Sequence, residues 1–288
     1  MSKTTDAAEP SAASLGSHSV IVGDCLEVLR AMPDSSVDLV LGSPPYECAR
    51  TYGIEFKLKG QAWVDWMMER WAEFQRVSRG AVVMVVEGQT RGFRWTATPA
   101  LLMADLHRRG FNLRKPPAFQ RCGIPGSGGP DWFRNDYEFC VVTTRGGRLP
   151  WSDNTAMGHA PRWAPGGDPS YRMPNGRRVH KLHTKAGPSG KRQQGYNPPA
   201  RANPGNVIAC KVGGGLMGSR LAHENEAPYP ESLAEFFIRS LCPPGGTVLD
   251  PFSGSGTTAA VALRHGRNAV SVDIRESQVN LTARRVSA

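Results

Sequence analysis

The chain has 288 residues and a net charge of +10, and it can bury a sizeable core as one catalytic domain with a large insertion or as two domains. No segment approaches the roughly 20 apolar residues of a membrane helix, and six cysteines without a Cys-x-x-Cys pair disfavour a zinc ribbon or a disulfide scaffold. His180 and His183 have ligand-like spacing but no partner cysteines, so we expect no metal. Residues 1–17 are small and polar, which predicts a disordered tail on a soluble, cytoplasmic protein.

The segment 18–144 predicts short strands alternating with helices. Apolar runs indicate strands at 19–22, 37–41, 81–86 and 137–143, with helices at 25–32, 61–78 and 99–109. Within 61–78 the large apolar residues recur every three or four positions, which is the period of an amphipathic helix. We interpret this stripe as core rather than as a base-stacking platform; it comprises Trp63, Trp66, Met67, Trp71, Phe74 and Val77.

The segment 145–220 carries nearly all of the excess positive charge. It holds 13 Lys or Arg against Asp153 and Asp168, a net +11, which leaves −1 for the rest of the chain. It also holds 14 glycines and 9 prolines, a density that disfavours long helices or strands. A loop-rich, cationic insert is typical of a polyanion-binding segment, although a solvated linker has a similar composition. The residues expected to contact nucleic acid are Arg177, Arg178, Lys181, Lys185, Lys191 and Arg192, with Trp151, Trp163, Tyr171 and Tyr196 as aromatic neighbours.

The segment 221–288 returns to alternating elements. Helices are predicted at 231–241, 257–265 and 277–285, and strands at 247–249 and 269–272. Such alternation implies an α/β fold in which a largely parallel sheet has helices on both faces. The segments 18–144 and 221–288 must then share one sheet, with 145–220 looped out between them.

A glycine-rich turn in this last segment predicts a nucleotide-like ligand. Gly254 and Gly256 follow a strand and open a helix, so the backbone can approach a ligand at the carboxyl end of the sheet. The next strand ends in Asp273, whose carboxylate can accept both hydroxyls of a ribose. Neither a phosphate-binding lysine nor the third glycine of a dinucleotide fingerprint is present. A ligand with adenosine and no pyrophosphate therefore fits best.

The tetrapeptide Ser43, Pro44, Pro45 and Tyr46 closes another predicted strand. The exocyclic amine of cytosine or adenine is a poor nucleophile, because its lone pair is delocalised into the ring. The Ser43 oxygen and the Pro44 carbonyl could accept its two N–H groups and aim the lone pair at an electrophile. Tyr46 would stack on a base extruded from the duplex. A proline turn that merely ends a strand is the simpler alternative.

In the order and spacing of these motifs, the chain from Ser19 to Val286 resembles the circularly permuted beta group of S-adenosylmethionine-dependent DNA amino-methyltransferases. The resemblance rests on Gly23-Asp24, the tetrapeptide, Tyr137 to Phe139, His223 to Leu233, Asp250 to Gly256, and Asp273. It implies a Rossmann-like sheet of about seven strands, formed by a catalytic half (18–144) and a cofactor-binding half (221–288), with a target-recognition insert at 145–220. It also implies S-adenosylmethionine as the cofactor and double-stranded DNA as the substrate.

By this resemblance, Asp24 would meet the adenine amine of the cofactor, Asp250 and Phe252 would line the methionine and adenosine pocket, and Asp273 would hold the ribose. The cofactor set implied is Asp24, Cys25, Asp250, Pro251, Phe252, Gly254, Gly256, Thr257 and Asp273. The tetrapeptide of the family begins with Asp in most adenine-N6 enzymes and with Ser in most cytosine-N4 enzymes. Ser43 therefore favours cytosine N4.

Several alternatives remain open from the sequence. An adenine-N6 methyltransferase would share every feature except the first residue of the tetrapeptide, at position 43. A non-enzymatic DNA-binding protein could keep the same fold. Structured RNA would match the positive charge as well as DNA does. Cytosine-C5 methylation is disfavoured, because that reaction needs a cysteine nucleophile, usually one that follows a proline. Cys242 instead precedes a proline and lies outside the tetrapeptide. The sequence also leaves open a homodimer and a cognate restriction nuclease that acts separately.

Overall fold

The computed structural model describes residues 16–47, 56–123, 128–131, 133–161, 170–180, 200–213 and 215–287. The chain divides into two compact units, one of residues 1–153 and 206–288 and the other of residues 154–205. Apart from its last two residues, the tail predicted at 1–17 lies outside the described ranges. None of the helices in these ranges combines the length and apolar character needed to cross a membrane.

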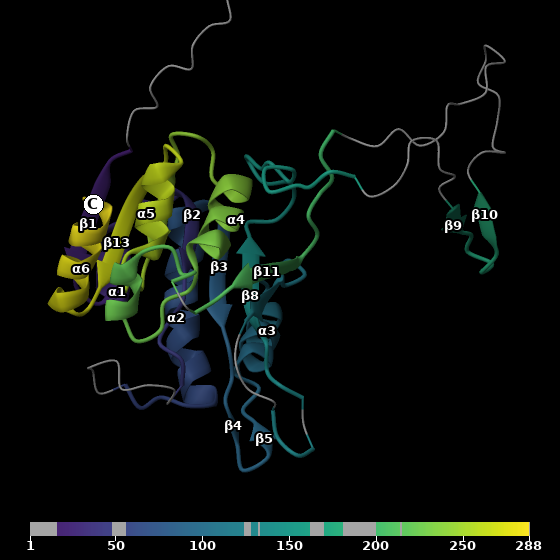
Figure 1. Cartoon of the computed structure of the whole chain (residues 1–288), viewed down its shortest axis with the longest axis horizontal. Coiled ribbons are helices and arrows are strands. Elements are labelled where there is room, and N and C mark those ends of the chain that lie inside the picture. The colour runs from purple at the N-terminus through teal and green to yellow at the C-terminus, as the bar shows by residue number, and fades with distance from the viewer. Residues whose placement is uncertain are drawn as a thin grey trace, which may run out of the picture. The chain divides into compact units, whose positions relative to one another are not determined.

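The larger unit is built on one sheet (Figure 1). Its strands are β1 (His18–Val22), β2 (Val37–Gly42), β3 (Ser78–Val86), β6 (Asn112–Leu113), β7 (Ala118–Cys122), β8 (Tyr137–Thr144), β11 (Val207–Lys211), β12 (Thr247–Asp250) and β13 (Asn268–Asp273). The path through the sheet is β1-β13-β12-β2-β3-β8-β7-β11, and β6 pairs with β8. All pairings on this path are parallel except those that β8 makes with β3 and β7. The expected α/β fold, with the two ends of the chain in one sheet, is confirmed.

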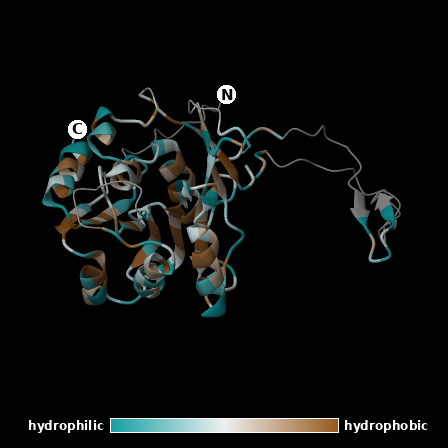
Figure 2. Cartoon of the chain, turned by 90° about the horizontal axis from the view of Figure 1, so that it is seen from below, coloured by the Kyte–Doolittle hydropathy of each residue, from teal (hydrophilic) through white to brown (hydrophobic). Residues whose placement is uncertain are grey.

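Helices cover both faces of this sheet. They are α1 (Cys25–Ala31), α2 (Gln61–Val77), α3 (Thr98–Arg108), α4 (Glu231–Leu241), α5 (Thr257–Arg264) and α6 (Glu276–Val286). Along β3, Ala81, Val83 and Val85 pack toward α4 and α5, whereas Val82, Met84 and Val86 pack toward α1, α2 and α3. This alternation follows from the period of two in a strand. Figure 2 shows the apolar strands enclosed between helices whose hydrophilic residues face outward.

The pairing of β12 with β2 marks the point where the chain connections diverge. From β12 the chain runs through α5 to β13 on one side, and from β2 it runs through α2 to β3 on the other side. These two helices lie on opposite faces, because α5 packs in one core cluster and α2 in the other. In open α/β sheets such a divergence leaves a crevice at the carboxyl ends of the two strands. Both sequence motifs begin there.

Close packing at this point requires a glycine at the end of β2. A Cβ on Gly42 would lie 2.7 Å from Asp250 Oδ1 and 3.3 Å from Pro251 Cδ. The Asp250 carboxylate is fully buried, and it accepts hydrogen bonds from the Phe252 N–H at 3.0 Å and from the Thr258 hydroxyl. Tyr229 contacts the same two side chains, Asp250 and Thr258. The end of β12, its turn and the first turn of α5 are therefore tied to one buried carboxyl.

The sheet differs from expectation at its far edge. The sequence did not predict β7 or β11, and β11 lies in the larger unit although it falls within the expected insert at 145–220. Its alternation of exposed and buried residues places Ile208 and Cys210 in the core. The described sheet consequently has nine strands rather than about seven. The smaller unit spans 154–205, a narrower range than the expected insert.

The smaller unit contains one described hairpin. Strand β9 (Ser170–Arg172) pairs in antiparallel register with β10 (Arg178–His180). The side chains of Arg172, Arg177 and Arg178 are exposed on this hairpin. A bridge between His159 and Ala202 joins the two ends of the unit. Lys181, Lys185, Lys191 and Arg192, which the sequence predicts as nucleic-acid contacts, lie outside the described residues, as do Trp163, Tyr196 and His183.

The buried Asp250 carboxyl makes stability depend on pH. Burial raises its pKa from 3.8 to about 7, so between pH 5 and pH 7 the folded chain holds a proton that the unfolded chain has released. The resulting contribution to stability is present in full at low pH and is lost as pH rises through 7. We predict that the unfolding free energy of wild type, relative to Asp250→Asn, falls by about 2 kcal/mol between pH 5 and pH 7.

Urea unfolding at several pH values measures this difference. Asp65→Asn, which changes an exposed carboxyl on α2, is the control and should follow the wild-type pH profile. Parallel profiles for wild type and Asp250→Asn would contradict the prediction.

Candidate active site

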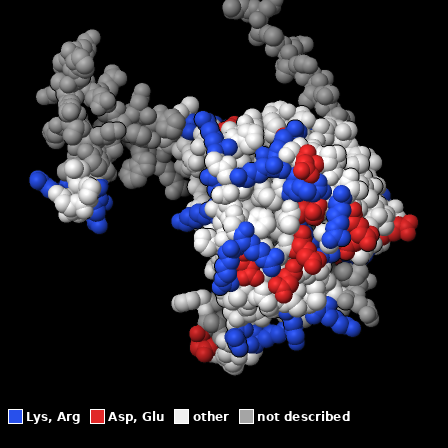
Figure 3. Space-filling view, turned by 180° about the vertical axis from the view of Figure 1, so that it is seen from behind, with Lys and Arg blue, Asp and Glu red and all other residues white. Residues whose placement is uncertain are grey.

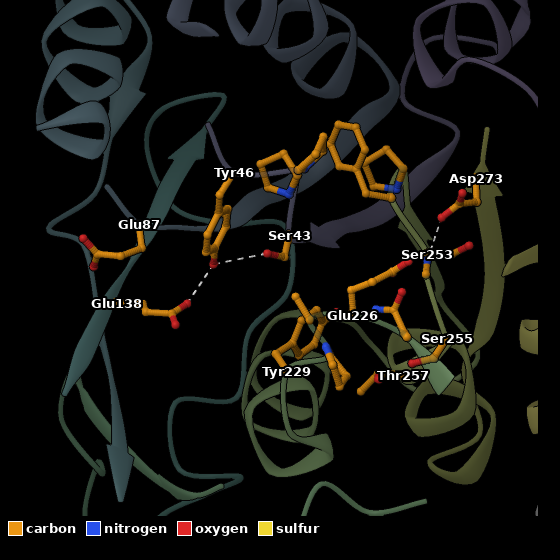
Figure 4. Close-up of a pocket in the computed structure, with 18 of the residues that line it drawn as sticks. Ser43, Tyr46, Glu87, Glu138, Glu226, Tyr229, Ser253, Ser255, Thr257 and Asp273 are labelled. Carbon is orange, nitrogen blue, oxygen red and sulfur yellow. Dashed lines mark hydrogen bonds between the residues drawn. The ribbon is translucent and has the colours of Figure 1, made fainter. Parts of the chain in front are cut away.

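A cavity of about 710 Å³ opens at the carboxyl ends of β12 and β2. Figure 4 shows residues of both motifs around it, with Ser43 and Tyr46 on one side and Ser253, Ser255 and Asp273 on the other. The Ser43 side of the cavity and the glycine turn are therefore parts of one site. All of the residues that line it belong to the larger unit.

The Ser43 side is organised by a chain of hydrogen bonds (Figure 4). Ser43 Oγ lies 3.3 Å from the Tyr46 hydroxyl and 3.2 Å from the Val85 carbonyl. The Tyr46 hydroxyl donates to Glu138 Oε2 at 2.7 Å, and Glu138 Oε1 lies 3.2 Å from a guanidinium nitrogen of Arg121. Strands β3, β7 and β8 and the segment after β2 thus supply these groups, which fixes the tyrosine ring beside the serine.

The Pro45 carbonyl and a second carboxyl, that of Glu87, complete this side. The Pro45 carbonyl accepts a hydrogen bond from the Trp63 indole at 2.9 Å, so α2 holds the tetrapeptide in place. Glu87, at the end of β3, lines the cavity and is nearly buried. Its Oε1 accepts hydrogen bonds from Gly88 N at 2.7 Å and Trp95 Nε1 at 3.2 Å. Burial raises the pKa of Glu87 above its ordinary value, which favours the neutral acid.

The opposite side is the glycine turn after β12. Gly254 and Gly256 have φ values of +49° and +76°, a backbone region that residues with a Cβ rarely adopt. A Cβ on Gly256 would also lie 2.8 Å from the Thr282 side chain, so α6 packs directly against this turn. Ser253 lines the cavity, and its buried hydroxyl has no hydrogen-bond partner among the described residues. An orphaned polar atom in such a place indicates a ligand contact.

Asp273 joins the glycine turn to the end of β13. Its Oδ2 accepts from Gly254 N at 2.9 Å, its Oδ1 accepts from Arg275 N at 2.9 Å, and its carbonyl accepts from Gly23 N at 3.0 Å. An ionised carboxylate has about four acceptor positions, so lone pairs remain after these bonds. The side chain therefore lines the cavity with acceptor capacity to spare.

Aromatic side chains form the wall between Asp24 and the glycine turn. The Phe252 ring lies 5.9 Å from Trp66, and Trp66 lies 5.1 Å from Phe56. The Arg70 guanidinium lies 4.0 Å above the Trp66 ring and 2.8 Å from Asp24 Oδ2. An apolar aromatic surface with a carboxylate at its edge suits a purine ring that carries an amine.

The structure brings together most of the predicted site residues. Ser43, Pro44, Pro45, Tyr46, Asp24, Cys25, Pro251, Phe252, Gly254, Thr257 and Asp273 all line the cavity. The expectation that Asp250 lines it is wrong, because the Asp250 carboxylate points into the core toward Thr258 and Tyr229. Gly256 also lies outside the lining, packed on Thr282. Both residues shape the turn from behind. Cys242 is buried away from the cavity, and burial raises the pKa of its thiol to about 12.

Several residues of the site were not predicted from the sequence. Trp66, assigned entirely to the core, lines the cavity together with Arg70, which lies one turn later on α2. The single arginine on an otherwise apolar face of α2 was the sequence signal that this face borders a site, since an arginine is rarely buried in a core without a partner. Glu87 follows a buried strand directly, as Ser43 does, and that position predicts a site residue in a parallel sheet. Asn225 falls within the stretch from His223 to Leu233 on which the resemblance rests, although it was given no role. Nothing in the sequence pointed to Arg121.

These residues fit S-adenosylmethionine as a ligand. The aromatic surface suits adenine, the spare acceptor capacity of Asp273 suits a ribose, and the orphaned Ser253 hydroxyl offers a further polar contact. The absence of a Cβ at Gly254 keeps the backbone open beside Asn225, which a Cβ would approach to 3.0 Å. The donor set lacks the basic side chain that a pyrophosphate would need within the turn.

Known proteins are similar to this chain in sequence and in fold. A type II methyltransferase of Streptomyces caespitosus, M.ScaI, is 27% identical over 92% of this chain and 80% of its own length. The DNA adenine methyltransferase YhdJ of Escherichia coli is 25% identical over 96% of this chain and 85% of its own length. The solved cytosine-N4-specific PvuII DNA methyltransferase superposes with a TM-score of 0.67 over 94% of this chain and 86% of its own, at 19% identity.

The DNA methylase family of N6 and N4 methyltransferases matches residues 37–284, from the first residue of β2 into α6. This range includes the tetrapeptide, the glycine turn and Asp273. The chain therefore belongs to the N6/N4 DNA methylase family, which confirms the predicted class of enzyme, a DNA methyltransferase that uses S-adenosylmethionine.

Proposed function

We propose that this enzyme methylates the exocyclic N4 amine of a cytosine that is flipped out of duplex DNA. One observation carries the proposal: the Ser43 hydroxyl lies at the end of β2, next to the glycine turn at the end of β12, and both line one cavity. A base amine held at Ser43 would face a ligand held by the turn. The circularly permuted order of motifs stays a prediction from the resemblance. Adenine N6 stays the alternative target atom.

The tetrapeptide can activate an amine by accepting its hydrogens. Because the Trp63 indole already occupies the Pro45 carbonyl, we assign the two acceptor roles to the Ser43 hydroxyl and the Pro44 carbonyl. Accepting both N–H groups draws the nitrogen toward a tetrahedral shape and directs its lone pair away from the ring. Proline fixes the backbone that carries these acceptors and has no N–H of its own to compete.

Tyr46 would stack on the face of the flipped base. Its hydroxyl is held by Glu138, which pairs with Arg121, so the ring has a fixed orientation before the base arrives. Preorganisation of this kind reduces the entropy lost when the reactants are aligned. Glu138 and Arg121 are thus positioning residues in this mechanism, because they act through Tyr46.

In the opposite half of the cavity, different residues would hold different parts of the cofactor. We assign the adenine ring to the aromatic surface of Phe252 and Trp66, its amine to Asp24 and the ribose hydroxyls to Asp273. The Ser253 hydroxyl and the open backbone at Gly254 would contact the rest of the ligand. Bound S-adenosylmethionine supplies an electrophilic methyl group, and the residues of the turn serve to hold that group toward Ser43.

The exposed arginines of the smaller unit, Arg177 and Arg178, belong to the DNA-contacting segment that we propose within 145–220. Lys or Arg side chains on a short hairpin can neutralise phosphates without reading sequence. A homodimer and a separately acting restriction nuclease remain predictions of the sequence.

The proposal predicts the modified base. DNA from cells that express the protein, digested to nucleosides and analysed by mass spectrometry, should contain N4-methylcytosine, and the site follows from sequencing sensitive to modified bases. DNA from cells that express Ser43→Ala is the control and should lack the modification. N6-methyladenine in its place would refute the assignment to cytosine while leaving the enzyme class intact.

The two halves of the cavity should respond differently to mutation. Ser43→Ala removes an acceptor used in the transition state, so kcat should fall by about 100- to 1,000-fold with little change in cofactor affinity. Asp273→Ala should weaken cofactor binding at least about tenfold while DNA association persists, since the hydrogen bonds that it removes are charge-assisted. Calorimetric titration with cofactor separates the two effects. Equal losses of affinity in both variants would contradict the division of roles.

The DNA-contacting segment should control the salt dependence of binding. Replacing Arg177 and Arg178 by Gln should lower DNA affinity and reduce the slope of log affinity against log salt by about 0.9 for each phosphate that is no longer neutralised. Arg108→Gln with Arg109→Gln, at the end of α3, is the charge-matched control and should leave the slope unchanged. An identical slope in both double variants would remove the hairpin from the DNA interface.

A further inference from the structure

A short hairpin projects from the rim of the cavity. Strand β4 (Thr90–Arg91) pairs with β5 (Arg94–Trp95) in antiparallel register, which leaves Gly92 and Phe93 as the two-residue loop. Figure 1 shows this hairpin beyond the end of β3, below the sheet. It was not predicted from the sequence, and the proposed function does not use it.

The base of the hairpin is fixed to the wall of the cavity. Gly88 and Gln89 line the cavity, and they lead directly into β4. Gln89 and Thr96 are joined by two hydrogen bonds, of 2.8 Å and 2.9 Å. The Trp95 indole donates to Glu87 and stacks on Phe139 with ring centroids 6.2 Å apart. A hairpin anchored in this way is a rigid extension of the site rather than a separate loop.

The tip of the hairpin holds a strained apolar residue. Gly92 and Phe93 have φ values of +52° and +63°, which is typical of a type I′ turn. Gly, Asn or Asp normally occupy such positions, and a bulky residue with positive φ is an outlier. Phe93 nevertheless stands here with 76% of its surface exposed. A strained and exposed apolar residue next to a site indicates a functional contact.

Positive charge surrounds the tip. Arg91 and Arg94 pair across the hairpin immediately before Gly92 and after Phe93, and both are exposed. Figure 3 shows Lys and Arg side chains along the lower edge of the larger unit, the edge at which Figure 1 places the hairpin. An apolar ring between two cations matches a duplex, which presents phosphates outside and stacked bases inside.

We propose that Phe93 is a wedge that enters the base stack of DNA when the target base leaves it, while Arg91 and Arg94 bind the flanking phosphates. Gln89 at the rim and Gly92 at the tip are three residues apart, a reach of about 10 Å in a strand. The tip of the hairpin therefore lies within about 10 Å of the rim of the cavity that receives the base. The wedge fills the gap in the stack and lowers the cost of keeping the base extruded. This inference rests on the flipped-base mechanism proposed above.

The test compares two duplexes that carry the target site mapped by sequencing. In one the target base has its normal partner, and in the other it faces an abasic site, so that it is already weakly held. Phe93→Ala should lower kcat/KM about 10- to 100-fold on the paired duplex and less than about threefold on the abasic duplex, because unstacking is costly only in the first. Phe93→Leu keeps an apolar wedge and should retain most activity on both.

Further variants exclude misfolding as the cause. Phe93→Gly suits positive φ, so its melting temperature should equal or exceed that of wild type while its kinetics match Phe93→Ala. Leu101→Ala is the control, because Leu101 is an exposed apolar residue on α3 that does not line the cavity. Equal losses on both duplexes, or no loss on either, would overturn the wedge. A wild-type enzyme that leaves no modified base in DNA would instead refute the proposed function.

Discussion

The parallel pairing of β12 with β2 is the constraint on which the site depends. The chain leaves these strands in opposite directions and on opposite faces, so the two loops that follow them border one crevice. The tetrapeptide and the glycine turn are about 200 residues apart in sequence, yet the fit of Gly42 against Asp250 brings them together. If β2 and β12 were not neighbours in the sheet, the proposed acceptor would be separated from the proposed cofactor loop.

Buried carboxylates stabilise the loops around this crevice. Asp250 holds the turn from behind through Phe252 and Thr258, and Asp273 holds it from the side through Gly254. Glu231 pairs with the fully buried Arg285 at 2.6 Å, which joins α4 to α6 beside the same turn. Removing one partner of such a buried pair is costly because a charge is left without compensation. The proposed cofactor loop is therefore held rigidly before any ligand binds, which lowers the entropy lost on binding.

The sequence predicted the central strands and both motifs, because buried parallel strands are continuous apolar runs and site residues follow their carboxyl ends. It missed β11, since the five residues of that strand lie within a segment whose glycine, proline and charge indicate loops. It assigned Trp66 to the core because periodicity identifies the apolar face of a helix without showing where that face leaves the sheet. Asp250 and Asp273 both end strands, and only tertiary partners such as Thr258 and Tyr229 decide which of them faces the cavity.

A crystal structure with an unreactive analogue of S-adenosylmethionine tests the central claim most directly. We expect that the ribose of the analogue meets Asp273, that its adenine lies against Phe252 and Trp66, and that the group replacing the methyl points across the crevice toward Ser43. The gap between that group and Ser43 should be wide enough for one base amine, with reacting atoms about 3–3.5 Å apart. An analogue bound elsewhere, or with the methyl position directed away from Ser43, would contradict the proposed mechanism.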